Sequence, residues 1–180
     1  MPAKLNGLKI ERKFTESGKD PFQKLDWKKR DVEIRNFDGT VAFSMKDVNL
    51  PDNYSQVAAN VLSQKYLRKA GVPKKLRKVK EKGVPIWLQK SVPDHKAMEN
   101  LTEDEKYGEE VDGKQTFRRL AGTWTYWGWK HGYFASEEDA RAYYDEMCFM
   151  LAFQMVSPNS PQWFNTGLNW AYGIEGPPQG

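Results

Sequence analysis

The feature that most constrains the fold is residues 137–156, which have the pattern of one helix that is apolar on every side near its end. The preceding Ser136-Glu-Glu-Asp139 is typical of a helix start, with Asp139 where a capping box usually has glutamate. In its second half, 147–156, only Gln154 is clearly polar. A helix that is apolar all round is buried all round, and this one is too short to cross a membrane. Because little sequence follows that could cover it, we expect a fragment or an obligate subunit.

Residues 31–46 predict a β-hairpin with a two-residue turn at Asp38-Gly39, a sequence typical of turns that need positive φ. Counting outward from this turn gives three cross-strand pairs: Asn36 with Val41, Ile34 with Phe43, and Val32 with Met45. The apolar residues then lie on one face, so the turn and the register agree. Because an isolated hairpin is marginally stable, this face is expected to pack on another element.

Two further helices are predicted from periodicity and capping. The first covers 56–69, with Ser55 as N-cap and Gly71 just past its end. Its expected inward positions are Val57, Ala58, Val61, Leu62 and Tyr66. The second runs from Thr116, with an apolar stripe of Phe117, Leu120, Trp124 and Trp127. An aromatic stripe at this spacing is typical of a core face, although stacked tryptophans could instead bind a base or a corrin ring.

Charge is unevenly distributed along the chain. Residues 65–82 hold nine basic side chains against one acidic one, which indicates either a solvated connector or a phosphate-binding patch. We favour the connector, because no aromatic residue that could stack on a base lies between 69 and 84. Residues 99–113 are acidic and lack apolar neighbours, so a mobile surface loop is expected. Arg118 and Arg119 are expected to form surface or inter-element ion pairs.

Composition excludes several classes of protein. No apolar stretch approaches the length of a membrane span, and the polar start of the chain does not resemble a signal peptide. A single cysteine, Cys148, cannot form an internal disulfide, which favours the cytoplasm, and its apolar surroundings indicate a structural role. His95 and His131 lack metal-ligand spacing. The net charge of +4 permits an anionic partner without requiring one.

Residues 157–167 combine two prolines, short polar side chains and two aromatic residues. Pro158 and Pro161 should stop the preceding helix and hold the chain extended. A stiff turn with polar tips and the anchors Trp163 and Phe164 suits the wall of a small-molecule pocket. It also suits a plain connection between a helix and a strand, which the residues by themselves favour.

Continued through residues 168–180, this segment resembles the start of the catalytic barrel of class II ribonucleotide reductases, which depend on adenosylcobalamin. The shared pattern is Ser-Pro-x-x-Phe-Asn-x-Gly at 160–167, moderately specific by itself. The tryptophan-rich run at 117–129 is much more specific, and the likeness includes 136–147. It extends more weakly to the segments before residue 70.

The resemblance implies reduction of ribonucleotides, with diphosphates expected, by a radical that begins at adenosylcobalamin and passes to a cysteine. It implies that Ser160 lines the substrate nucleotide, and we expect Asn159 and Asn165 to brace that loop. The cobalamin ligands, the redox cysteines and the site of a dNTP effector are implied to lie outside this chain. The intact enzyme would use a thioredoxin-like reductant, and this chain would be inactive alone.

The expected fold class is α+β, mainly helical with an N-terminal β-hairpin, leading into a ten-stranded α/β barrel that is not contained in the chain. We expect a flexible arm (1–20), a hairpin-plus-helix region (21–98), an acidic surface loop (99–115), and helices with a substrate loop (116–180) that pack against the rest of the barrel. One alternative is a nucleic-acid-binding module, which we consider unfavoured. Another is a split-gene subunit that completes a reductase in trans.

Overall fold

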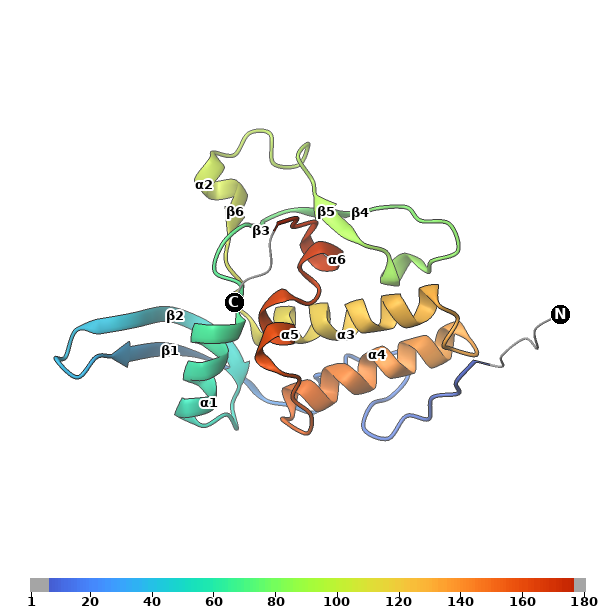
Figure 1. Cartoon of the computed structure of the whole chain (residues 1–180), viewed down its shortest axis with the longest axis horizontal. Helices are drawn as coiled ribbons and strands as arrows, with labels where there is room; N and C mark the ends of the chain where they lie inside the picture. Colours follow the sequence, from blue (N-terminus) through green and yellow to red (C-terminus); the bar gives the residue numbers. More distant parts are fainter. Residues whose placement is uncertain (1–6, 177–180) are drawn as a thin grey trace.

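The computed structural model describes residues 7–176, and at its centre the helices α3 (Gly113–Lys130) and α4 (Glu137–Ala152) lie side by side (Figure 1). A two-stranded antiparallel hairpin, β1 (Trp27–Arg35) and β2 (Val41–Pro51), projects to one side of them. The other elements are short: α1 (Gln56–Val61), the π-helix η1 (Leu62–Tyr66), β3 (Val72–Pro73), β4 (Leu76–Lys78), the 3₁₀-helix η2 (Ile86–Leu88), β5 (Ser91–Pro93), α2 (Glu103–Lys106), β6 (Tyr107–Gly108), α5 (Ser160–Asn165) and α6 (Leu168–Tyr172). Strand β3 pairs with β6, and β4 pairs with β5. The described chain is thus α+β with a hairpin and several helices, as predicted.

One hydrophobic core joins elements that are far apart in the sequence. It contains Val32 from the hairpin, Leu62 from η1, Leu120 from α3 and Leu151 from α4, all buried. Trp163 of α5 also belongs to this core. Each fully buried side chain of this size contributes about 1.5–3 kcal/mol relative to exposure. The core therefore fixes α5 against the two long helices.

The hairpin confirms two of the three predicted pairs, Ile34 with Phe43 and Val32 with Met45. The two-residue turn is wrong. The amide of Asn36 donates to the carbonyl of Thr40 at 2.8 Å, which leaves a loop of residues 37–39. Within that loop only Gly39 has positive φ, at 86°. This geometry fits the three-residue hairpin in which a type I turn is followed by a left-handed glycine. It changes the cross-strand partner of Val41 from the predicted Asn36 to Arg35.

The first predicted helix begins as expected but changes type. The Ser55 hydroxyl accepts from the amide of Ala58 at 3.1 Å, which confirms the N-cap. From Leu62 the chain winds as a π-helix that ends at Tyr66 rather than at residue 69. The extra residue in that turn rotates the apolar stripe. Leu62 is buried as predicted, whereas Val57 is 71% exposed and the inward prediction is wrong there.

The central helices are also close to prediction. Helix α3 begins at Gly113, earlier than expected, because Asp112 and Gln115 form a capping box. Its Phe117 is buried, but Trp127 is half exposed and does not continue the core stripe. Helix α4 has the predicted Ser136 cap and ends at Ala152, because Gln154 adopts φ of 59°. The apolar stretch 147–156 is therefore not one helix, and Phe153 and Met155 are exposed.

The polar start of the chain is anchored, in contrast to the expected loose arm; residues 1–6 lie outside the described part. Leu8 forms a β-bridge with the segment between α3 and α4. The Arg12 guanidinium donates to Asp145 at 2.8 Å, and Thr15 donates from its amide and its hydroxyl to Glu146 at 2.8 and 2.6 Å. Because both acids are buried on α4, these bonds attach residues 8–15 along that helix.

The acidic segment was expected to be a mobile surface loop, and that expectation is wrong in part. Its exposed acids Glu103, Asp104 and Glu105 form the first turn of the short helix α2, which begins with a capping box at Thr102, and the following strand β6 pairs with β3. Glu110, however, is fully buried. The groups that bond to it come from Arg68, α3 and α6, which are distant in the sequence, so the local lack of apolar residues did not reveal its burial.

Candidate functional site

Residues 157–167 are extended only as far as Asn159 and then form α5. The Asn159 side chain accepts from the amide of Gln162 at 3.4 Å and so caps that helix. Pro161 occupies the first turn, where the missing amide interrupts no intrahelical hydrogen bond. The extended backbone predicted after Asn159 is therefore wrong, because Pro161 here starts a helix instead of preventing one.

Ser160 is exposed at the start of α5, and its hydroxyl is held by one neighbour. The Ser160 Oγ and Tyr66 Oη atoms are 3.1 Å apart, within hydrogen-bond distance. The Tyr66 ring stacks on Trp163, with centroids 5.2 Å apart and an angle of 11°. Trp163 Nε1 in turn donates to the Ser157 hydroxyl at 3.3 Å. Two exposed serines, the partly buried Tyr66 ring and the buried Trp163 ring thus form one connected cluster.

Below this cluster lies Arg119 of α3, whose side chain is completely buried. Its Nη1 donates to the carbonyls of Trp163 and Thr166, each at 2.8 Å. Its Nη2 donates to the carbonyl of Tyr66 at 2.9 Å. One guanidinium therefore ties the end of η1 to both ends of the last turn of α5, which fixes the backbone on either side of the Tyr66–Ser160 contact.

The charge of Arg119 is balanced by Glu110, which is also fully buried. The two side chains meet through Arg119 Nε and Glu110 Oε1 at 2.8 Å. Glu110 further accepts from the Thr116 hydroxyl at 2.8 Å and the Tyr172 hydroxyl at 2.7 Å. A buried ion pair is tolerated when its remaining donors and acceptors are satisfied, as they are here. Burial, then the neighbouring Glu110 carboxylate, raises the pKa of Tyr172, so this hydroxyl stays a donor.

Gly167 allows the chain to leave α5 against the backbone of α3. Its φ is 90°, which favours glycine. A Cβ added there would lie 2.3 Å from the carbonyl oxygen of Arg119. No side chain fits in that space, so the backbone approach that orients α5 requires glycine at this position.

Two hollows flank α5. One, of about 240 Å³, is lined by Tyr66, Trp163 and Ser157 together with apolar side chains of α1 and α4. The other, of about 290 Å³, is lined by Asn165, Gly167 and Trp170 among others. The sequence-predicted site residues thus divide: Asn159 and Ser160 lie together at the start of α5, and Asn165 lies at its end. Their roles in substrate binding stay predictions.

Three residues that organise this site were not predicted as site residues. Arg119 was expected in an ion pair between elements, which is confirmed, but nothing indicated that it holds α5. Tyr66 was expected only as an inward residue of a helix. Glu110 was expected to be exposed on a surface loop. A weak signal existed in Thr116, Arg119 and Thr123, whose helical spacing places an arginine on a face of small residues that can surround it.

The histidines, the cysteine and the basic run show neither a metal site nor a reactive thiol within residues 7–176. No cluster of three potential metal ligands occurs within residues 7–176. Cys148 is buried, and burial raises the pKa of its thiol, as a structural cysteine requires. In the basic run, Lys69 and Lys78 turn inward onto the rings of Phe43 and Trp170. The described helices include none that is long and apolar enough to span a membrane.

Comparison with known proteins decides the family. Residues 28–154 match the model for the N-terminal region of class II vitamin B12-dependent ribonucleotide reductases. The chain belongs to this family. Vitamin B12-dependent ribonucleotide reductases of Agrobacterium fabrum and Bradyrhizobium diazoefficiens are each 57% identical to it over 173 residues, or 96% of the chain. The enzyme of Streptomyces avermitilis is 32% identical over 166 residues.

These alignments cover 14% of the length of each of the three relatives. The chain thus corresponds to the N-terminal part of a class II reductase. The family match includes α3 and all of α4, and the alignments with the two 57% identical relatives take in nearly all of the chain.

Proposed function

We propose that this chain is the N-terminal region of a reductase that converts ribonucleotides to deoxyribonucleotides, and that α5 supplies part of its substrate site. The observation that carries the proposal is the exposed Ser160 hydroxyl, which Tyr66 orients and which rests on the buried Arg119–Glu110 pair. A hydroxyl fixed in this way can donate to or accept from a phosphate or ribose oxygen without first losing conformational freedom. The remaining walls of the site, in an α/β barrel, would come from sequence outside this chain.

The relatives are vitamin B12-dependent reductases, and we propose the adenosyl form of the vitamin as the radical source. The described residues of this chain do not fit a site for it. His95 and His131 are exposed and belong to no ligand cluster within 7–176, and the Cys148 thiol is fully buried. No step of the reaction is therefore assigned to the described residues beyond contact with substrate.

Three further parts of the proposal concern the intact enzyme. Its substrates are ribonucleoside diphosphates, its electrons come from a thioredoxin-like reductant, and a dNTP acts as effector. These ligands would be bound by sequence outside this chain, except for the substrate contact at Ser160. The nucleic-acid alternative gains nothing from the structure, because two of the lysines it would use lie against aromatic rings of the chain itself.

The proposal is tested by Ser160→Ala in the full-length reductase, with Ser44→Ala on the exposed hairpin surface as matched control. A hydrogen bond to a charged phosphate contributes about 1.5–3 kcal/mol, so the affinity for ribonucleotide should fall about tenfold or more. Ser44→Ala should leave it unchanged. Because a contact through the backbone would survive the substitution, hydrogen exchange of residues 160–167 is measured with and without nucleotide. Unchanged affinity together with unchanged exchange would refute the proposal.

A further inference from the structure

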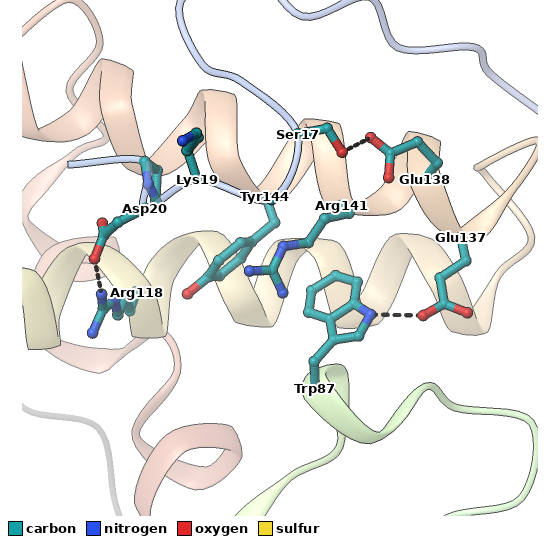
Figure 2. A pocket seen from close by; sticks show the side chains of 11 residues that line it. Ser17, Lys19, Asp20, Trp87, Arg118, Glu137, Glu138, Arg141 and Tyr144 are labelled. Atoms are coloured by element: carbon teal, nitrogen blue, oxygen red, sulfur yellow. Dashed lines mark hydrogen bonds and ion pairs between the residues drawn. The ribbon is translucent and has the colours of Figure 1, made fainter. Parts of the chain in front are cut away.

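A separate pocket of about 830 Å³ lies on the chain away from α5 (Figure 2). Its walls are the loop 17–21, Trp87, Arg118 of α3, and side chains from the first half of α4. None of these residues belongs to α5, to η1 or to the Arg119–Glu110 pair. The volume is within the range of pockets that hold small molecules.

Of the three cations that line this pocket, Arg141 has its guanidinium held by the most neighbouring side chains. Its guanidinium lies 4.8 Å from the ring centre of Trp87 and 5.4 Å from that of Tyr144, and Figure 2 shows it between the two rings. Within the described part of the chain, its one ionic contact is from Nε to Asp145 at 3.3 Å. Among residues 7–176, neither Nη1 nor Nη2 of Arg141 donates a hydrogen bond to the protein. A guanidinium that is held flat with its terminal edge unengaged is preorganised for bidentate contact with an oxyanion.

Two more cations face the same pocket with donors to spare. Arg118 makes one ion pair, to Asp20 at 3.2 Å, and the two side chains are 46% and 49% exposed. Exposed pairs of this kind contribute little, so Arg118 can exchange Asp20 for a stronger acceptor. Lys19 is exposed and has no ion pair within the described part of the chain.

The pocket's carboxylates are already engaged at its edges. Glu137 accepts from Trp87 Nε1 at 3.0 Å, and Glu138 accepts from Arg12 and from Ser17 at 3.0 and 3.1 Å. Figure 2 shows Glu138 turned toward Ser17 and Asp20 turned toward Arg118. Three acidic and three basic side chains line the pocket, so their formal charges balance. Recognition there must come from short contacts with unused donors instead of long-range attraction.

We propose that this pocket binds a phosphate-bearing small molecule, with the phosphate between Arg141 on one side and Arg118 and Lys19 on the other. A phosphate group suits the arrangement because it presents several oxygens and carries close to two negative charges, so it can satisfy donors from both walls. This site is distinct from the one at Ser160, and it does not depend on the reaction proposed for the intact enzyme.

Calorimetric titration of the full-length reductase with inorganic pyrophosphate tests the site. Arg141→Gln should weaken binding about tenfold or more, because it removes a charge-assisted bidentate contact. The matched control is Arg35→Gln, an exposed arginine of β1 that is paired with Glu33 and lies outside the pocket. Titration of Ser160→Ala separates this site from the substrate site, because the pyrophosphate binding that Arg141→Gln weakens should keep its wild-type affinity in this variant.

A fourth variant should change the affinity in the opposite direction, which a folding defect could not produce. Asp20→Asn keeps the Oδ1 acceptor that caps Phe22 but removes the charge that competes for Arg118. Pyrophosphate affinity should therefore rise severalfold. The proposal is overturned if wild-type protein fails to bind pyrophosphate at millimolar concentration, if Arg141→Gln and Arg35→Gln bind equally, or if Asp20→Asn weakens binding.

Discussion

Replacing Arg119 by methionine should destabilise this chain more than almost any other single substitution that preserves side-chain volume. The guanidinium makes five hydrogen bonds, two of them to Glu110, and both side chains are completely inaccessible to solvent. Removing one partner leaves a buried charge without compensation, at a cost of about 3–5 kcal/mol. Because domains are stable by only about 5–15 kcal/mol, the variant should fold but with a large fraction of its stability lost.

The measurement is urea unfolding followed by tryptophan fluorescence and by circular dichroism, which should give coincident transitions. Arg118→Met is the matched control, because this neighbouring arginine is half exposed, its ion pair with Asp20 is at the surface, and a methionine can keep the packing on the Phe22 ring; its effect should stay within about 0.5 kcal/mol. The double variant Glu110→Gln/Arg119→Met should lose less stability than the two single variants added together, since it removes the unpaired charge. A loss below about 1 kcal/mol for Arg119→Met, or strict additivity, would refute the reasoning.

Three other outcomes are expected. Gly167→Ala should cost more than about 2 kcal/mol in unfolding free energy, because its Cβ would meet a backbone oxygen; a smaller loss would show that α5 can shift. Tyr66→Phe should weaken ribonucleotide binding severalfold in the full-length enzyme and change the stability of the fold by less than about 1 kcal/mol, since only the hydroxyl bonded to Ser160 is lost. The hydrogen bond from the Ser136 hydroxyl, followed by that from the amide of Ile10, lowers the pKa of Asp139. Its contribution to stability is therefore present above about pH 4 and lost as the pH falls further, so Asp139→Asn and wild type should differ at about pH 6 and converge in acid; a constant difference would contradict this.

Structure determined by near neighbours in the sequence could be predicted. The pairing of Ile34 with Phe43 follows from alternation and a turn a few residues away, and it is present. The N-caps at Ser55 and Ser136 depend on hydrogen bonds to amides only three residues further along the chain, and both hydrogen bonds form. The turn itself was misjudged because Asp38-Gly39 suits both a two-residue and a three-residue loop, and sequence does not distinguish them.

Structure determined by distant segments could not be predicted. Glu110 lies in an acidic stretch, and only the approach of α3 and α6 removes it from water. The π-helical turn that ends at Tyr66 has no local signature, yet it carries the Tyr66 hydroxyl to Ser160. A substrate-binding role for Ser160 stays a prediction from likeness to a family, whereas the buried arginine that holds its helix was visible only in the folded chain.

The anchoring of residues 8–15 along α4 has a consequence for the order in which the molecule can fold. Arg12 and its partner Asp145 are separated by 133 residues. At a synthesis rate of about 5–20 residues per second, the partner leaves the ribosome on the order of ten seconds after Arg12. Contacts of such long sequence separation also form slowly after synthesis, because a long loop must close first. Residues 8–15 are therefore among the last to reach their native position, and α4 must be in place before they do.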